Sequence, residues 1–406
     1  MNLSYFISKR IAASGKDSFS STIHKIAVGS IGVGLAVMII SFLILKGFQD
    51  TVTDKIYSFS SHFLVTKYTL GNSYEESPIS INNDLYNNYK QYDFIDHVQE
   101  YSHKAGLIKT NDEVLGIIFK GVGTSFDQQR FKPNLVEGRF VEFDSSGYSK
   151  EVLISRIISN KLKLKVGDDV VIHFFQNPPR VRKLKIVGIY ETNLSEYFDD
   201  KFVIGDISLI QKLNNWADSV AGGMEVFVKN ESKIDENEAK LEDIVDYDLF
   251  VEKVSDKYLQ VFDWLHLISR QVNIFLAIIL FVVCVNMISI ILILIMERTQ
   301  MIGLLKAFGA NNGLIRQVFS FNGMQLIMKG LLLGNLLGIG LGAIQYYFQL
   351  IPLNPHDYYM SYVPIGWSWE VIISLNLLTF VVVSLIIIIP TTVIARINPI
   401  KSIKYD

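Results

Sequence analysis

The 406-residue chain is 50% hydrophobic and 19% charged, too apolar for an ordinary soluble protein and too charged to lie in a membrane throughout. Residues 50–269 hold 25 Lys and Arg against 35 Asp and Glu, a net charge of −10, whereas the rest of the chain carries +8. This split is typical of an acidic extracytoplasmic domain with basic cytoplasmic loops. The single cysteine, Cys284, excludes an intramolecular disulfide and is interpreted as a small buried hydrophobe.

Four apolar runs are long enough to cross a hydrocarbon core about 30 Å thick. The runs are Ile26–Leu45, Val272–Met296, Leu326–Tyr347 and Val371–Ile389. Only the third contains a charge, Lys329, which lies near one end where a lysine can snorkel. The first run lacks a small-residue cleavage pattern, so we expect a retained anchor rather than a signal peptide. We predict spans over 26–48, 269–296, 317–348 and 371–394.

The loops between these spans differ in charge, and the difference predicts orientation. The N-terminal tail, the loop after the second span and the C-terminal tail are all basic. By the positive-inside rule, an amphipathic segment over 1–25, a loop over 297–316 and a tail over 395–406 are expected in the cytoplasm. A large domain over 49–268 and a short loop over 349–370 are then periplasmic. The expected location is the inner membrane, with both termini cytoplasmic.

Polar and small residues inside the spans favour helix packing over transport chemistry. Gly330, Gly334, Gly338 and Gly342 recur every four residues and predict the close approach of another helix. Asn273 and Asn286 are expected to hydrogen-bond between helices. No span contains the buried carboxylate of a proton-coupled transporter. Energy for uphill transport must therefore come from a partner.

The domain between the first two spans has the patterns of a mixed α/β fold. We expect two strands over Val98–Val122, a helix over Asp84–Phe94 and a strand near Met224–Val228. Glu151–Ile189 is expected to form a short helix, a turn at Gly167-Asp168 and a pair of strands, and Phe202–Leu213 a strand followed by a helix. A helix over Lys253–Ile268 should run straight into the second span.

No sequence pattern of an enzyme is present. The chain has no Walker glycine loop, HExxH, CxxC or Gly-x-Ser-x-Gly pattern, and its histidines lack the spacing of a metal site. We therefore expect a non-catalytic protein with no metal and no cofactor of its own.

The loop after the second span contains the most specific motif. Glu297–Gly323 reads ERTQMIGLLKAFGANNGLIRQVFSFNG, with an apolar side suited to docking in a groove and Gly309 as a helix stop. It resembles the coupling helix of FtsX-like and MacB-like ABC permeases, roughly E-R-x-x-E-I-G-x-L-[RK]-A-[LIM]-G-A, although Met301 replaces the second Glu. The resemblance implies contact with an ATPase through a set of loop residues. These are Glu297, Arg298, Met301, Ile302, Gly303, Leu305, Lys306, Phe308 and Gly309.

Other segments resemble the lipoprotein-releasing (LolC/LolE-type) branch of that family: Phe6–Arg10, Lys46-Gly47-Phe48, and the ending Ala395–Pro399 after Pro390. This resemblance implies a permease dimer, identical or mixed, with two separate ATPase subunits that bind the ATP. It also implies that triacylated lipoproteins are extracted from the inner membrane and handed to a periplasmic chaperone. Membrane lipids are further expected partners, and nucleic acid is not. A MacB-like exporter of peptides or small molecules and an FtsX-like regulator of a cell-wall hydrolase remain alternatives.

Two further candidate sites depend on this interpretation. Apolar residues in the outer halves of the first two spans are expected to line a lipid-receiving cavity: Met38, Phe42, Leu45, Phe262, Leu265, Phe275 and Leu276. A hairpin over His173–Lys183, with strands ending near Phe175 and beginning near Leu184, is the expected chaperone contact. Its contact residues are Phe174, Phe175, Gln176, Asn177, Pro178, Pro179, Arg180 and Arg182.

Overall fold

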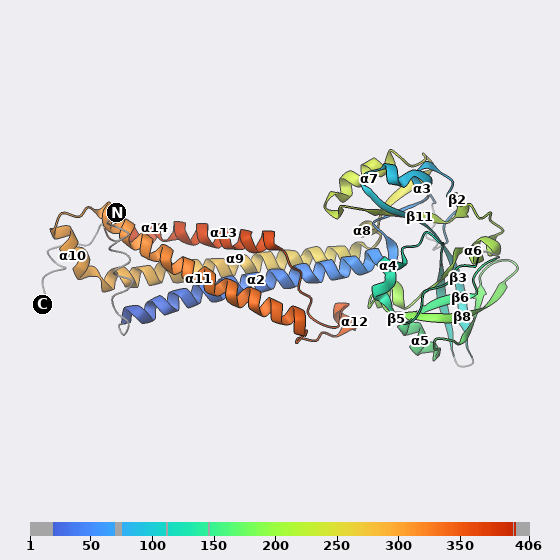
Figure 1. Cartoon of the computed structure of the whole chain (residues 1–406), viewed down its shortest axis with the longest axis horizontal. Helices are drawn as coiled ribbons and strands as arrows, with labels where there is room; N and C mark the ends of the chain where they lie inside the picture. The colour runs from blue at the N-terminus through green and yellow to red at the C-terminus, as the bar shows by residue number, and fades with distance from the viewer. Residues whose placement is uncertain (1–18, 70–74, 111–112, 145–146, 393, 395–406) are drawn as a thin grey trace. The chain divides into compact units, whose positions relative to one another are not determined.

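The computed structural model describes residues 19–69, 75–110, 113–144, 147–392 and 394. It divides into two compact units (Figure 1). The helical unit contains residues up to 50, residues 264–352 and residues from 362 onward; the α/β unit contains 51–263 and 353–361. The motifs Phe6–Arg10 and Ala395–Pro399 lie outside the described residues.

The helical unit confirms four candidate membrane spans, and three of their helices are much longer than a bilayer requires. They are α2 (Phe19–Ser60), α9 (Leu259–Glu297), α11 (Asn312–Phe348) and α13 (Trp369–Ile386), with a final turn α14 (Ile388–Thr391). At 1.5 Å per residue, the 42 residues of α2 extend about 63 Å, about twice the thickness of the hydrocarbon core. Each long helix therefore continues past its apolar run.

The glycines of α11 pack against α2, which confirms the interpretation of that stripe. A side chain at Gly330 would lie 2.6 Å from Ile31 Cβ, and one at Gly334 would lie 2.8 Å from Leu35 Cβ. Gly338 faces Ile39 and Gly342 faces Leu43 in the same way. Because small residues let two helices approach closely, α2 and α11 form a tight pair.

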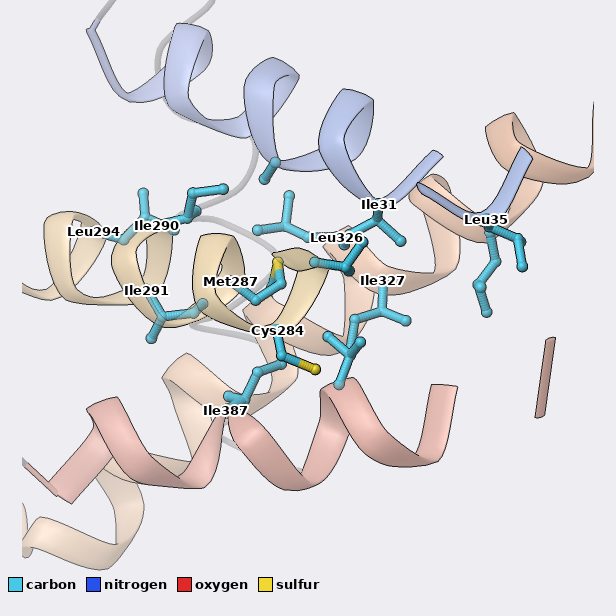
Figure 2. Packing of buried hydrophobic residues seen from close by; sticks show 14 of the residues in the cluster. Ile31, Leu35, Cys284, Met287, Ile290, Ile291, Leu294, Leu326, Ile327 and Ile387 are labelled. Atoms are coloured by element: carbon cyan, nitrogen blue, oxygen red, sulfur yellow. The ribbon is translucent and has the colours of Figure 1, made fainter. Parts of the chain in front are cut away.

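The remaining helices complete one apolar core (Figure 2). It includes Ile31 and Leu35 of α2, Cys284 and Met287 of α9, and Ile387 at the end of α13. Cys284 is buried, as expected of a small hydrophobe. Asn286 donates a hydrogen bond to Ser30 Oγ at 3.0 Å, which confirms its expected bond between helices.

The α/β unit contains a ten-stranded sheet in the order β12-β1-β11-β3-β4-β9-β6-β8-β5, with β7 pairing with β3 and β8. Its strands are β1 (Phe63–Lys67), β3 (Ile95–Lys109), β4 (Val114–Val122), β5 (Leu135–Gly138), β6 (Glu151–Ser155), β7 (Asp169–Phe174), β8 (Arg180–Tyr190), β9 (Phe202–Asp206), β11 (Gly223–Val228) and β12 (Leu249–Lys253). A separate two-stranded sheet pairs β2 (Ile79–Ser80) with β10 (Val220–Ala221). The mixed α/β fold is confirmed.

Helices cover this sheet in two places and create two apolar cores. One core lies where α3 (Asp84–Asn88) and α7 (Ile234–Glu242) pack on β1, β11 and β12. The other lies where α5 (Arg156–Leu162) and α6 (Ile207–Asn214) pack on β4 and β6 to β9. The remaining short helices are η1 (Tyr89–Gln91), α4 (Gln128–Phe131), η2 (Lys132–Asn134), η3 (Ser195–Asp199), η4 (Glu231–Lys233), α8 (Val254–Lys257) and α12 (Pro355–Tyr358).

Strand β3 joins the two parts of the sheet that carry these cores. One edge of β3 pairs with β11 up to Tyr101 and with β7 from Gly106. Carboxylates fill the gap between these pairings. Glu76 accepts a hydrogen bond from the His103 backbone N–H at 3.0 Å, and Glu75 accepts one from Ala105 at 3.1 Å. Side chains thus satisfy two backbone donors that have no neighbouring strand.

Several local expectations are confirmed and others are wrong. Strands β3 and β4, the pair β9 and α6, strand β11 and the helix beginning at Asp84 lie where expected. Glu151–Ser155 is a strand rather than the start of a helix, which begins only at Arg156. Tyr258 separates α8 from α9, so the expected continuous helix over 253–268 is interrupted.

Candidate functional site

The loop that carries the coupling motif forms a short helix, α10 (Thr299–Ala307), between α9 and α11. Gly309 follows it with φ +92°, a backbone conformation that favours glycine. Phe308 is 86% exposed, and Leu304, one helical turn before it, is exposed as well. This outward apolar surface can bind a groove on a partner.

Other residues of the motif face the interior of the chain. Ile302 and Gly303 are buried, while Met301 and Leu305 pack against the core of the helical unit. Lys306 donates a hydrogen bond to the backbone carbonyl of Ile394 at 2.8 Å. Arg298 lies between the two helices and starts the first turn of α10 by accepting from Ile302 N–H. Of the expected coupling residues, Glu297, Phe308 and Gly309 are exposed.

The residues expected to line a lipid cavity do not share one surface. Met38, Leu45 and Leu265 are buried within this chain, and Phe42, Leu276 and Phe262 are partly buried. Phe275 alone among them is exposed, with 49% of its surface accessible. It belongs to an exposed apolar stripe on α9 formed by Ile274, Phe275, Ile278, Phe281, Val282 and Val285.

An apolar groove of about 450 Å³ lies between α2 and α9. Its walls include Ile26 and Val33 from α2 and Val282 from α9, and the Ser30–Asn286 hydrogen bond lies within it. Sequence analysis missed the residues of α2 in this groove. Gly29 and Gly34 of α2 also line it: a side chain at Gly29 would meet nothing within 4 Å, whereas one at Gly34 would lie 2.4 Å from Val283 Cγ2.

The hairpin between β7 and β8 is shorter than expected. Strand β8 begins at Arg180, which pairs with Phe174, so the loop is limited to residues 175–179. Phe174 is buried and packs edge-to-face on Phe119, with ring centroids 5.7 Å apart, so its ring is not on the surface. Phe175, by contrast, is 55% exposed.

The base of this hairpin is attached to the end of α6. Gln176 donates to the carbonyl of Leu213 at 3.4 Å, and Arg180 donates to that of Lys212 at 3.2 Å. Asn177, Pro178 and Pro179 are exposed at the tip, and Arg182 is partly buried. The exposed tip therefore presents Phe175 and a proline pair on a fixed base.

Family models match most of the chain. Residues 26–244 match the MacB-like periplasmic core domain, and residues 273–399 match the FtsX-like permease C-terminal domain. The chain belongs to the FtsX-like permeases with a MacB-like periplasmic core. This family membership confirms the resemblance of the α10 motif and the placement of a large α/β domain between the first two helices.

Relatives of this FtsX-like permease cover nearly its whole length. It is 22% identical over 390 residues to the lipoprotein-releasing system transmembrane protein LolE of Haemophilus influenzae, and the alignment covers 91% of each chain. Its identity to LolC of the same organism is 21%, covering 97% of this chain and 96% of that one. The periplasmic region of MacB from Actinobacillus actinomycetemcomitans is 14% identical with a TM-score of 0.35, and covers 50% of this chain and 92% of that structure.

Proposed function

We propose that this permease releases lipoproteins from the inner membrane and hands them to a periplasmic chaperone, using ATP bound by separate ATPase subunits. The observation that carries the proposal is the match to LolE over 91% of both chains, which includes both the helices and the α/β domain. The chain itself binds no ATP and catalyses no reaction. The triacylated lipoprotein, a second permease, two ATPases and the chaperone are its partners.

The charges of the loops support one orientation. The loop that contains α10 carries Arg298, Lys306 and Arg316 against Glu297, so it lies in the cytoplasm with both termini. The acidic α/β domain then lies in the periplasm. This orientation exposes Phe308 and Leu304 of α10 to the ATPase and the hairpin tip near Phe175 to the chaperone.

Energetics explain why such a machine needs an apolar surface for its cargo. Returning one acyl CH₂ group to water costs about 0.8 kcal/mol, so a multi-chain anchor costs tens of kcal/mol. The groove between α2 and α9, with the exposed stripe of α9, offers the acyl chains a continuous apolar surface. Photo-crosslinkers at Val33 and Phe275 are therefore expected to capture the lipoprotein before ATP is added. A crosslinker at Leu336, exposed on α11, is the matched control.

Depletion of the permease in cells tests the proposal. Newly made outer-membrane lipoproteins are expected to accumulate in the inner-membrane fraction within one generation, while periplasmic proteins without an acyl anchor are exported normally. Normal lipoprotein sorting after depletion, or a defect confined to peptide or small-molecule export, would refute it.

A further inference from the structure

A cleft of about 380 Å³ lies on one face of the sheet in the α/β unit, separate from the groove between α2 and α9. Its floor consists of side chains in register across three strands: Leu64 pairs with Glu225 on one side and with Glu252 on the other. The next row contains Thr66, opposite both Gly223 and Phe250. The opposite face of these strands is packed in the apolar core, so only this face is open.

Tyr101 of β3 points into the cleft across Gly223. A side chain at Gly223 would lie 2.8 Å from Tyr101 Cε1 and 2.9 Å from Thr66 Cγ2, so the glycine makes room for the ring. Tyr101 is fully buried, yet its hydroxyl has no hydrogen-bond partner among the described residues. Leaving a buried hydroxyl without a hydrogen bond is unfavourable, and a bound donor or acceptor would recover that loss.

The charges around this hydroxyl favour a cation. Burial raises the pKa of Tyr101 well above its ordinary value, and the carboxylates of Glu76, Glu225 and Glu252 raise it further, so the phenol stays neutral. His103 lies 2.6 Å from Glu76, and Lys120 lies 2.6 Å from Glu225. Among the described residues, Glu252 has one ion pair, to Lys257 at 3.9 Å, and its side chain is partly exposed, so this carboxylate can bind another cation.

Aromatic rings stand at the mouth of the cleft. Tyr68 and Phe250 are both exposed, and their rings meet edge-to-face with centroids 6.3 Å apart. Aromatic faces attract ammonium groups and also cover the apolar stem of a long side chain. The cleft therefore offers a site for one long cationic side chain. The rings of Tyr68 and Phe250 would cover its stem, and the Glu252 carboxylate and the Tyr101 phenol would bind its charged end.

We propose that this cleft binds a lysine side chain of a polypeptide. The ammonium group donates hydrogen bonds to the Tyr101 hydroxyl and to Glu252, and the stem of the lysine lies against Tyr68 and Phe250. An anionic side chain is disfavoured because the carboxylate of Glu252 would repel it, whereas Glu76 and Glu225 are already paired with His103 and Lys120. This site adds a peptide-binding role to the proposed release of lipoproteins. Its binding chemistry does not depend on which cargo the permease carries.

Peptide binding to the full-length permease in detergent micelles tests this proposal. The probe is a dye-labelled, end-blocked Gly-Ser-Lys-Ser-Gly peptide followed by fluorescence anisotropy, and peptides with norleucine or glutamate at the centre are controls. We expect the unaltered permease to bind the lysine peptide saturably and to bind neither control peptide. The Tyr101→Phe and Glu252→Gln variants are expected to bind the lysine peptide at least fivefold more weakly. Tyr247→Phe and Glu142→Gln, at exposed positions of the same unit, are matched controls expected to bind as the unaltered protein does.

Thermal melts of each variant separate loss of the site from loss of the fold. Tyr101→Phe removes an unsatisfied hydroxyl, so its melting temperature is expected to equal or exceed that of the unaltered protein. Equal affinity of the two cleft variants and the unaltered protein would overturn the proposal. Equal binding of the norleucine peptide would overturn it as well.

Discussion

Lys306 on α10 donates a hydrogen bond to the backbone carbonyl of Ile394, 88 residues further along the chain. This bond ties the helix of the coupling motif to the end of the fourth span. The motif therefore has two faces: Phe308 and Leu304 are available to a partner, while Ile302, Gly303 and Lys306 hold α10 on its own chain. Movement of α10 by an ATPase would then be transmitted directly to the helices.

Replacing Lys306 with methionine is expected to weaken this transmission. A hydrogen bond from a charged group contributes about 1.5–3 kcal/mol, so the number of lipoproteins released per ATP hydrolysed should fall about ten- to hundredfold. Both quantities can be measured together in proteoliposomes that contain the ATPase. Lys25→Met, at an exposed position of α2, is the control. An unchanged ratio in Lys306→Met would show that the tie has no role in coupling.

The contact of α2 with α11 should be sensitive to a single methyl group at Gly334. An added Cβ would lie 2.8 Å from Leu35 Cβ and 2.9 Å from the Gly32 carbonyl oxygen, so the helices must separate. Gly334→Ala is expected to cost about 1–3 kcal/mol of stability and to lower the melting temperature in detergent. Gly340→Ala meets nothing within 4 Å and should melt at or slightly above the original temperature. Equal melting of the two variants would contradict this packing.

Stability of the α/β unit should decrease at acid pH through Glu76. Burial alone would raise the pKa of Glu76, but the charge and hydrogen bonds of His103 outweigh it and hold that pKa below its ordinary value. The ionised Glu76 therefore contributes fully to the free energy of unfolding above its unfolded-state pKa of about 4.3. This contribution is lost as the pH falls through the lower pKa of Glu76 in the folded protein. Glu76→Gln should be less stable at neutral pH but lose less stability between about pH 5 and 3. The measurement is urea unfolding across this range, with Glu142→Gln as control; identical pH profiles would exclude the role of Glu76.

Neighbouring phenylalanines of the hairpin should respond differently to substitution. Phe174→Ala removes a buried ring and is expected to cost about 3–5 kcal/mol of stability. Phe175→Ala removes an exposed ring, so the fold should be unchanged while binding to the chaperone weakens at least fivefold. Surface plasmon resonance with the purified chaperone measures the affinity. If Phe175→Ala bound as tightly as the unaltered permease, the contact would lie elsewhere on the domain.

Sequence patterns predicted the features that depend on local composition. The four spans follow from long apolar runs, and the α11 stripe follows from a four-residue spacing. The strand Glu151–Ser155 was missed because a short apolar run has no period that separates strand from helix. The hairpin loop is shorter than expected because the charged residues Arg180, Arg182 and Lys183 resemble a loop, although all three pair with β7.

Contacts between distant residues could not be predicted in the same way. Ser30 and Asn286 are 256 residues apart, and their bond within the groove follows only from the packing of α2 on α9. The two carboxylates that cap β3 depend on a gap between β11 and β7 that no local pattern reveals. The cleft at Tyr101 likewise arises from the register of four strands. Local periodicity therefore identified elements and a family motif, whereas the sites required the fold.

The central claim is tested most directly by ATP-dependent release from proteoliposomes. Vesicles would contain the permease, its ATPase and a fluorescent triacylated lipoprotein, with the purified chaperone outside. We predict that the lipoprotein moves to the soluble chaperone fraction only when ATP, ATPase and permease are all present, and that Phe308→Ala abolishes release while the exposed control Phe348→Ala does not. Continued ATP hydrolysis with the lipoprotein retained in the vesicles would contradict the account.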